Sequence, residues 1–481
     1  MGTDETSPTA ALTADAAPPA ISPTAQRLAS LAVASALFME FIDSTALSTA
    51  LPTLAHAFHA DPVHLKLALT SYILALAVFT PISGWAAEKL GAKPVFMSAM
   101  AVFLLGSVLC GFSTTLPELV AARLVQGLGG AMMTPVARLI VVGSAPRERL
   151  IQAMGWFTTP ALLGPLIGPP LAGFVLGVAD WPWIFFINVP VGLLGMAAVV
   201  KFVPRITSPD PGGFDWSGFF LSALAITGVV VVAETAGLPL LPNWAKVVAL
   251  IAAAIALAVY IRQASRRSRP ILDLTLLRFP TFRASLLGGA FVRLGIGAGP
   301  FLMPLLLQVG LHWSPLHAGT VTFAGGIGVL GARPFAAFTL RKFGFRVQLV
   351  SFVLLTGLLS AAPAFFREST PVPLIMALLL LAGFCRSNQF IAANTIAYAD
   401  VPQAKVAAAS TLAAVSQQVS LALGVSFGGF MLHVARGAGG VLTPDRFIVP
   451  YLAVGATTLL AIPVYWMLAP DAGSSISGRR G

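Results

Sequence analysis

Long apolar runs recur along the whole chain, and each is about as long as a helix that crosses a lipid bilayer. Such a crossing takes about 20 mostly apolar residues. Fourteen runs of this kind begin near residues 29, 65, 95, 119, 151, 183, 216, 243, 284, 317, 347, 372, 406 and 448. Only 10% of the 481 residues are charged, whereas soluble domains carry about 25%. The sequence therefore predicts an all-α polytopic membrane protein whose surroundings are a lipid bilayer.

Lysine and arginine fall mainly in every second loop between these runs. The richer loops and the C-terminal tail contain Lys89, Lys93, Arg147, Arg149, Lys201, Arg205, Arg262, Arg266, Arg267, Arg269, Arg278, Arg283, Arg341, Lys342, Arg346, Lys405, Arg479 and Arg480. The other loops hold only Lys66, Lys246, Arg367, Arg436 and Arg446. Basic loops stay on the cytoplasmic side. This asymmetry predicts fourteen spans with both termini cytoplasmic, in the plasma (inner) membrane. It also accounts for the net charge of +11 without a nucleic-acid partner.

A short turn of basic residues and glycine occurs twice. One copy, Glu88–Lys93, follows the second run, and the other, Arg341–Arg346, follows the tenth. If the seventh and eighth runs are an insertion, each turn joins the second and third helices of a six-helix bundle. Two such pseudo-symmetric bundles suit alternating access around a site at the membrane midplane. The predicted domains are a disordered cytoplasmic tail at 1–27, a bundle at 28–203, two inserted helices with linkers at 204–280, a second bundle at 281–470 and a cytoplasmic tail at 471–481.

Two acidic residues lie inside the first apolar run. Glu40 and Asp43 are three residues apart and share one helix face, which Ser44 and Ser48 extend. A charged side chain at the centre of a membrane helix costs about 2.5–3.5 kcal/mol, so this face should look into the bundle. An ionisable group in such surroundings can load and release protons. The alternative is structural, with Asp43 bonded to Thr45 or to the end of a neighbouring helix.

Other polar side chains also interrupt the apolar runs. Arg123 is followed by Gln126 and three glycines, and small residues allow another helix to approach closely. Glu234, at the outer end of the seventh run, is interpreted as an interfacial residue. Polar residues in the apolar runs could either line a solute path or lock helices together, and the sequence favours neither reading. These residues are Gln126, Arg293, Arg386, Asn388, Gln389, Gln417 and Gln418.

The fifth run combines prolines with glycines. Proline removes a helical hydrogen bond and kinks the helix, and glycine lets a neighbouring helix come close. The sequence therefore predicts a kinked helix with a close neighbour, which could be a hinge or a static contact. The residues concerned are Gly164, Pro165, Gly168, Pro169 and Gly173.

Five motifs, in this order along the chain, resemble the major facilitator superfamily and, within it, the branch of fourteen-span drug:proton antiporters. The resemblance covers about residues 29–470 and gains its specificity from the order and positions of the motifs. They are Ile42–Thr45 in the first run, Gly84–Lys93 after the second, Arg123–Gly127 in the fourth, Gly164–Gly173 in the fifth and Trp181–Pro190 at the sixth. Two positions depart from the pattern of the family. Glu88 stands where an Asp is usual, and Pro182 stands where an Arg is usual.

The resemblance implies the major facilitator fold and efflux driven by inward proton flow, with no cofactor and the proton gradient as the energy source. It implies that Asp43 and Arg123 are the proton-coupling pair, and Glu40 is a further candidate because it shares the helix face of Asp43. It also implies a loop motif that latches the outward-open state. The residues of this motif are Gly84, Glu88, Lys89, Gly91 and Lys93.

The predicted function is therefore a secondary active transporter, a proton-coupled antiporter that exports drugs or other amphipathic small molecules. Protons and the small-molecule substrate are its expected partners, and a periplasmic adaptor protein is left open. One alternative is a uniporter or symporter for a nutrient or metabolite. Another class, a membrane-embedded enzyme, needs a metal cluster or an activated nucleophile. The six histidines do not cluster that way, Cys110 and Cys385 lie in apolar runs, and no Walker loop is present.

Overall fold

The computed structural model describes residues 23–145, 149–204, 212–267, 269–437 and 440–474. Within these ranges, every regular element is a helix. Most of the tail predicted at 1–27 and the basic residues Arg147, Arg205, Arg479 and Arg480 lie outside the described residues.

Sixteen α-helices and six shorter helical segments follow one another along the described chain. The α-helices are α1 Pro23–Ala57, α2 Lys66–Leu90, α3 Ala92–Phe112, α4 Leu116–Ser144, α5 Leu150–Val178, α6 Trp183–Phe186, α7 Asn188–Phe202, α8 Trp216–Glu234, α9 Asn243–Ala264, α10 Pro280–Gly297, α11 Gly299–Pro304, α12 Pro315–Ala361, α13 Val372–Ile396, α14 Val406–Arg436, α15 Ile448–Leu459 and α16 Ala461–Trp466. The shorter segments are η1 Pro62–Leu65, η3 Leu274–Arg278, η4 Leu305–Gly310, η5 Ala362–Phe365, η6 Gln403–Lys405 and η7 Pro444–Phe447.

Thirteen helices in the described ranges are long and apolar enough to cross a membrane. One of them, Pro315–Phe365, has 51 residues, more than twice the roughly 20 that a crossing needs. Gly344 breaks this helix with φ 78° and ψ 171°, a conformation that favours glycine because it has no Cβ. Gly91, in the other basic turn, also has a positive φ, 92°. Counting the two arms of α12 separately gives 13 + 1 = 14 crossings, while the number of spans and the sidedness of the termini stay predictions.

The first helix begins earlier than the sequence predicted. Residues 23–27, which were assigned to a disordered tail, form the first turn of α1, so that assignment is wrong for them. Gln26 in this turn is buried, and its side-chain amide donates to the Ser144 hydroxyl at the end of α4 (3.4 Å). Packing against α4 therefore orders a segment whose composition alone looks unstructured.

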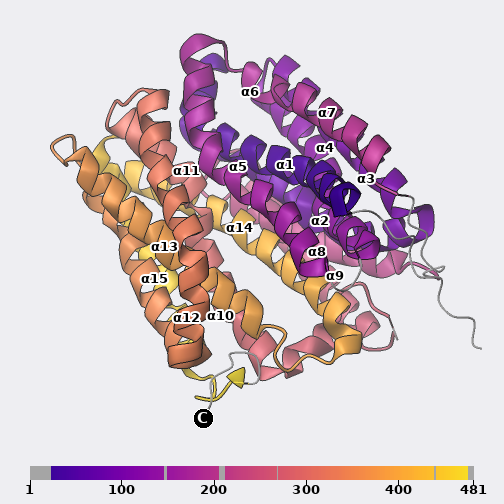
Figure 1. Ribbon diagram of the computed structural model, residues 1–481. Helices are drawn as coiled ribbons and strands as arrows, with labels where there is room; N and C mark the ends of the chain where they lie inside the picture. Colours follow the sequence, from indigo (N-terminus) through magenta and orange to yellow (C-terminus); the bar gives the residue numbers. More distant parts are fainter. Residues whose placement is uncertain (1–22, 146–148, 205–211, 268, 438–439, 475–481) are drawn as a thin grey trace, which may run out of the picture.

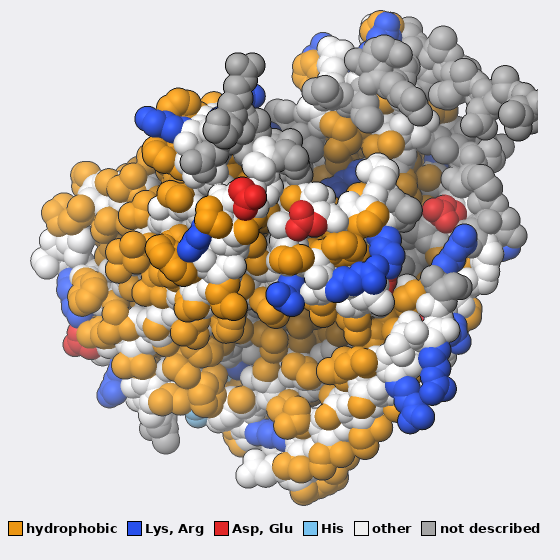
Figure 2. All heavy atoms as spheres, turned by 90° about the horizontal axis from the view of Figure 1, so that it is seen from below, with side chains coloured by type: hydrophobic (Ala, Val, Ile, Leu, Met, Phe, Trp, Pro, Cys, Tyr) orange, Lys and Arg blue, Asp and Glu red, His pale blue; other side chains and the backbone are white. Residues whose placement is uncertain are grey.

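The long helices run up and down, so alternate turns lie at the same end of the molecule. The turns after α2, α4 and α7 and the Gly344 turn of α12 are all at one end, together with the linker after α9. These turns carry most of the Lys and Arg side chains, and we call this end the basic end. Figure 2 shows a face with a largely hydrophobic surface on which Lys and Arg side chains gather in a few places.

The helices form two groups (Figure 1), α1 to α7 in indigo to magenta and α10 to α16 in pink to yellow. The inserted pair, α8 and α9, joins them on one side, because α8 packs on both α2 and α14. α9 contacts mainly α8 and exposes most of its apolar residues. Only 17% of its apolar stretch is buried, against 61% for α1. α1 is therefore a central helix and α9 a peripheral, lipid-facing one.

One hydrophobic cluster joins the two groups, and it lies at the end away from the basic turns. Side chains from the last turns of α1 and the start of α2 pack there against α11 and η4, including Leu47, Leu51, Leu302 and Leu306. The other large clusters each lie within one group or between one group and the inserted helices. We call this apolar contact the seal.

Ion pairs fasten the linkers around the inserted helices. Asp215 caps α8 by accepting from the Gly218 backbone amide (2.9 Å) and pairs with Arg267 after α9 (2.6 Å). Asp273 accepts from Lys405 just before α14 (2.7 Å). Burial raises the pKa of the Asp273 carboxyl, but hydrogen bonds from Lys405 and Thr275 outweigh it and hold this pKa below its usual range. The linker is thus held by a carboxylate, Asp273, that stays ionised at neutral pH.

Candidate functional site

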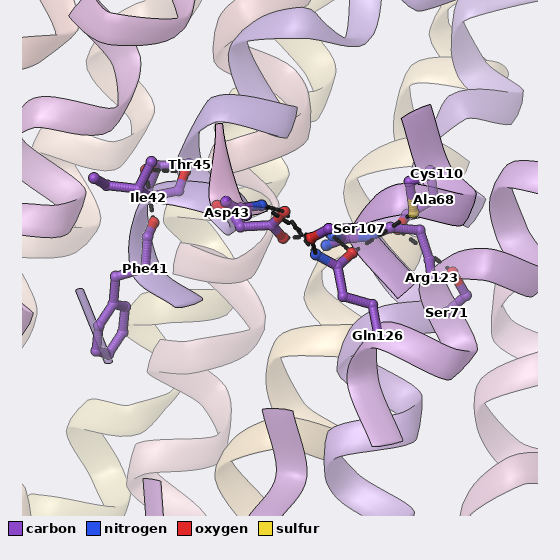
Figure 3. Close-up of polar contacts among 11 residues, drawn as sticks. Phe41, Ile42, Asp43, Thr45, Ala68, Ser71, Ser107, Cys110, Arg123 and Gln126 are labelled. Carbon is purple, nitrogen blue, oxygen red and sulfur yellow. Dashed lines mark hydrogen bonds and ion pairs between the residues drawn. The ribbon is translucent and has the colours of Figure 1, made fainter. Parts of the chain in front are cut away.

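Asp43 lies at the centre of a buried polar network that joins α1, α3, α4 and α7 (Figure 3). One carboxylate oxygen, Oδ2, accepts from Arg123 Nη1 at 2.5 Å. The other, Oδ1, accepts from the side-chain amides of Gln126 and Asn188, both at 2.8 Å. These amides also donate to the Ser107 hydroxyl. Three donors converge on a carboxylate with no exposed surface, so the network is built around the ionised form of Asp43.

Arg123 is as deeply buried as its partner. Its Nε donates to the Ala68 backbone carbonyl of α2 (3.2 Å), and its guanidinium carbon lies 4.3 Å from the centre of the Tyr72 ring. Its Nη1 also donates to the amide oxygen of Gln126 (2.6 Å). A buried charge is tolerated only when it is paired and hydrogen-bonded. Asp43 and Arg123 therefore depend on each other, and a proton on Asp43 would remove the charge that balances Arg123.

The glycines that follow Arg123 let α4 approach two helices at once. A Cβ at Gly127 would lie 2.7 Å from the Tyr72 carbonyl oxygen of α2, and one at Gly129 would lie 2.5 Å from the Phe103 nitrogen of α3. Real Cβ atoms do not come so close. The close approach predicted from the small residues is present, and it brings the backbones of α2 and α3 to the helix that carries Arg123.

Glu40 has a different environment, although it shares a helix face with Asp43. Its carboxylate accepts from the Thr134 hydroxyl of α4 (3.0 Å), and it lies on the wall of a central cavity. The sequence left open that Asp43 merely bonds to Thr45. That alternative is wrong, because Thr45 donates to the carbonyl oxygens of Phe41 and Ile42 and not to Asp43. The two acids therefore divide into a fully enclosed one and one that faces the cavity.

The cavity lies between the two groups of helices and has a volume of about 640 Å³. Its walls come from α1, α2 and α4 on one side and from α10, α13 and α14 on the other. Tyr398 and Ser410, near the basic end, line one part of it, and Leu69 and Val425 line the part next to the seal. The cavity therefore extends from the middle of the molecule toward the basic end.

The seven polar residues that the sequence proposed for a solute path fall into three places. Arg386, Gln417 and Gln418 line the cavity. Gln126 belongs to the Asp43 network. The remaining three are buried within the second group of helices: Arg293 beside Tyr465, Asn388 donating to the Phe384 carbonyl within α13, and Gln389 donating to the Tyr465 hydroxyl. Three of the seven residues therefore face the cavity, and the other four pack among helices, while a role in a solute path stays a prediction.

The loop-motif residues lie at the basic end around the turn between α2 and α3. Lys93 donates to the backbone carbonyls of Val200 (2.9 Å) and Val203 (2.6 Å) at the C-terminal end of α7, where a cation is favourable. Glu88 and Lys89 are exposed, and a Cβ at Gly84 would meet nothing within 4 Å. In this conformation Lys93 ties α3 to α7, and the space around Gly84 is open.

The glycine and proline motif of the fifth run lies in α5, which is one helix from Leu150 to Val178. Gly164 faces Phe41 of α1, where a Cβ would lie 2.6 Å from the Phe41 Cβ, and Gly168 faces Thr45. Gly173 faces the start of α12, where a Cβ would lie 2.6 Å from the Pro315 carbonyl oxygen. α5 thus touches both groups of helices along this stretch, with backbone close to backbone.

Three polar links cross between the two groups near the seal. The Ser48 hydroxyl of α1 donates to the Pro300 carbonyl of α11. The side-chain amide of Gln308 donates to the Thr49 carbonyl (2.8 Å). Arg436 at the end of α14 pairs with Asp61 before η1 (2.7 Å). All three hold this end of the molecule closed.

A second buried charged cluster was not anticipated from the sequence. Lys66, at the start of α2, and Glu234, at the end of α8, are both buried, and their charges attract each other. The Ser426 hydroxyl of α14 donates to the Glu234 carboxylate. The interpretation of Glu234 as an interfacial residue is therefore wrong, because α8 packs this end of the helix against α2 and α14.

Sequence reasoning also missed Asn188 as a partner of Asp43, Ser107 as the acceptor behind the amides of Gln126 and Asn188, and Thr134 as the partner of Glu40. Asn188 was within the motif at the start of the sixth run, and an Asn in an apolar run was the signal that could have found it. Ser107 and Thr134 gave no such signal, because hydroxyls are common in membrane helices, where they bond to their own backbone. In the described residues, no group of three or more His, Cys, Asp or Glu side chains could hold a metal ion.

Comparison with known proteins gives three findings. A family model described as the Major Facilitator Superfamily matches residues 33–285 and again residues 285–480. The curated "Putative multidrug resistance protein MdtD" of Pectobacterium atrosepticum is 35% identical over 449 residues, covering 91% of this chain and 95% of that protein. The protein of the same name from Citrobacter koseri is 36% identical and covers 85% of this chain and 88% of its own length.

Solved structures share the fold at low sequence identity. A peptide transporter POT in complex with sulfate has a TM-score of 0.69 and 13% identity, covering 93% of this chain and 95% of its own. A POT family transporter in complex with 5-aminolevulinic acid has the same TM-score and identity, with 94% and 97% covered. At this identity the likeness concerns the arrangement of the helices.

Proposed function

This chain belongs to the major facilitator superfamily, and from that membership we propose that it is a proton-coupled antiporter that exports amphipathic small molecules by alternating access. It is a membrane transporter and not an enzyme. The multidrug-resistance names of its relatives support export of drugs or similar solutes. The observation that carries the proposal is the buried Asp43–Arg123 pair.

Asp43 is suited to carry the proton because protonation would change its surroundings strongly. The ionised carboxylate accepts from Arg123, Gln126 and Asn188 on two other helices. A neutral Asp43 would leave the Arg123 guanidinium without its counter-charge in a site with no exposed surface, which is costly. Relief of that cost requires α1, α4 and α7 to rearrange. A proton on this one residue thereby couples to movement of three helices in the first bundle.

The conformation supports the direction of transport. The seal and its three polar links close one end, and the cavity extends toward the basic end. Basic turns are typical of the cytoplasmic side. With that orientation, a solute from the cytoplasm would load into the cavity, and opening of the seal would release it outside. Glu40, on the cavity wall, is placed to sense the solute.

The proton gradient is a sufficient energy source for such export. One proton that crosses about 100 mV supplies about 2.3 kcal/mol. A tenfold concentration ratio of an uncharged solute corresponds to about 1.4 kcal/mol. One proton per solute therefore sustains a ratio of more than tenfold, and no cofactor is required.

The first prediction tests Asp43 in transport. In energised inverted vesicles, Asp43→Asn should abolish substrate flux that depends on the proton gradient, because the residue can no longer exchange a proton. Asp180→Asn, at an exposed position after α5, should transport like the wild type. The measurement is fluorescent-dye or drug accumulation with and without a protonophore.

Equal proton-coupled flux in Asp43→Asn and wild type would remove Asp43 from the mechanism. Flux that a protonophore leaves unchanged would instead support a uniporter of the same fold, and flux in the opposite sense would support a symporter. Purified protein in proteoliposomes gives the same comparison without a periplasmic adaptor, so activity there would show that an adaptor is not required.

A further inference from the structure

The central cavity contains an uneven set of charges. Among the residues that line it, the charged ones are Glu40, Arg138 and Arg386. The cavity therefore carries a net charge of +1 when Glu40 is ionised (two positive and one negative) and +2 when Glu40 is protonated. Such a positive balance is unexpected for a cavity that would have to attract organic cations.

The negative charge is already engaged, whereas the positive charges are not. Glu40 is buried and accepts from Thr134. Arg138 and Arg386 are both exposed to the cavity space. Neither guanidinium has an ion-pair or hydrogen-bond partner in the described ranges. An arginine without a partner at membrane depth is costly and is retained mainly at functional positions, and a guanidinium matches a carboxylate or sulfonate with two parallel hydrogen bonds.

The two arginines come from opposite sides of the cavity. Arg138 belongs to α4 in the first group of helices, and Arg386 belongs to α13 in the second. An acidic group held by Arg386 would leave Arg138 as a second positive charge from the other wall. An anion bound there would contact both halves of the transporter, so its binding would respond to their relative movement.

The rest of the cavity is mostly apolar. Phe41, Leu76, Phe390 and Val425 contribute to its walls, and Gln417 and Gln418 add neutral hydrogen-bonding groups. Its volume of about 640 Å³ lies in the range of pockets that bind small organic molecules. The site therefore offers apolar contact for the body of a solute and positive charge for one end of it.

We propose that the cavity selects amphipathic anions, that is, small molecules with an apolar body and one acidic group such as a carboxylate or sulfonate. Arg386 contacts the acidic group, and Arg138 adds attraction from the facing wall. This proposal rests on the proposed transport function for its biological role. It is physically consistent with export, because the membrane potential, negative inside, drives a negative charge outward.

Binding to the purified full-length protein in detergent tests the proposal separately from transport. The probes are three naphthalenes of matched size that carry a carboxylate, a primary amide or a trimethylammonium group. We expect the wild type to bind the carboxylate most tightly. Arg386→Gln should weaken binding of the carboxylate by about tenfold or more, as expected for a hydrogen bond between two charged groups, and should leave binding of the amide within about twofold. Arg138→Gln should weaken binding of the carboxylate probe by a smaller factor.

A matched control is Arg333→Gln, which removes an exposed arginine of α12 that does not line the cavity. It should bind all three probes like the wild type. Thermal unfolding of each variant verifies that it is folded. The proposal is overturned if the three probes bind equally, if none binds, or if the trimethylammonium probe binds best and loses affinity in Glu40→Gln. Anion-selective binding without proton-coupled export would refute the proposed antiport and leave this inference standing.

Discussion

At the scale of single residues, Asp43 differs from most membrane acids in the number of partners it has. Its two oxygens accept from three donors on two other helices, and Arg123 depends on it for its charge balance. Removing one partner of a buried pair usually costs much more than removing both, because the remaining charge is left without compensation. The pair should therefore behave as a unit in stability as well as in transport.

A double-mutant cycle tests this second prediction. Asp43→Asn should lower the free energy of unfolding by about 3–5 kcal/mol, because it leaves Arg123 buried and unpaired. The double variant Asp43→Asn, Arg123→Gln should recover a substantial part of that loss. The measurement is reversible unfolding in mixed detergent, with Asp180→Asn as the exposed control. Additive effects of the two substitutions would show that the residues do not interact.

The sequence indicated which acidic residues to examine, but not which of them is enclosed and which faces the cavity. Helix periodicity correctly placed Glu40 and Asp43 on one face, and the cost of a charge in lipid correctly predicted that this face is buried. Which acid is enclosed and which faces the cavity depends on the packing of α3, α4 and α7 around them. Asn188 and Ser107 are distant from Asp43 in sequence, so only the three-dimensional arrangement identifies Asn188 as its partner and Ser107 as a member of the same network.

At the scale of helices, the inserted pair is anchored at one specific point. The end of α8 brings Glu234 to Lys66 of α2 and Ser426 of α14, so one inserted helix contacts both halves. A Cβ on Gly429 of α14 would lie 2.5 Å from Cδ of the Lys66 side chain. The Lys66 and Glu234 side chains are therefore enclosed where three helices meet, and water has little access to them.

The third prediction concerns this cluster. Glu234→Gln should lower the free energy of unfolding by several kcal/mol, because the Lys66 ammonium would remain buried without a carboxylate. Lys66→Met should lower it by a similar amount, because the Glu234 carboxylate would then remain buried without a positive charge. The double variant Glu234→Gln, Lys66→Met should be more stable than either single variant. Urea or detergent unfolding monitored by tryptophan fluorescence provides the measurement. Single variants as stable as the wild type would mean that water reaches the pair.

The helices themselves were largely predictable, because a bilayer crossing requires a long apolar run. The sequence placed the turn at Arg341–Arg346, and Gly344 adopts a positive φ there. It misjudged the start of α1 and the position of Glu234. Both errors have the same cause: contacts with distant helices, α4 in the first case and α2 with α14 in the second, override what the local composition suggests.

At the scale of the whole molecule, the two halves meet through the seal, and α8 and α5 add contacts at their sides. The Arg436–Asp61 ion pair crosses between the halves at the seal, and both side chains are partly exposed, at 16% and 31%. Exposed ion pairs contribute at most about 1 kcal/mol. Such a pair is too weak to determine the fold, yet strong enough to bias an equilibrium between two conformations.

The fourth prediction follows from that bias. Arg436→Gln should favour the conformation that is open at the seal, by up to about fivefold for a pair worth 1 kcal/mol. Labelling of Leu305→Cys, a position fully buried in the seal, by a membrane-impermeant maleimide should accelerate in that background. Labelling of Ser410→Cys, near the basic end of the cavity, should slow down. Both measurements need Cys110 and Cys385 replaced. Unchanged labelling at both positions would show that the ion pair does not hold the seal.

The duplicated architecture could be inferred from the two basic turns, whereas the conformation could not. Under the proposed alternating access, each half would have the same composition with the seal open or closed, because the same residues would face a cavity in one state and a neighbouring helix in the other. The hydrogen bond from Ser48 to Pro300 across the seal belongs to the closed arrangement, and nothing in the sequence around either residue indicates it.

The closed seal also has an electrical consequence. The cavity reaches inward from one surface and carries charged and polar groups, so water and ions within it would stay near the voltage of that compartment. The voltage across the membrane would then fall mainly over the short apolar layer around Leu47 and Leu302. A charge would need to move only across that layer, a fraction of the membrane thickness, to gain most of the energy of a full crossing.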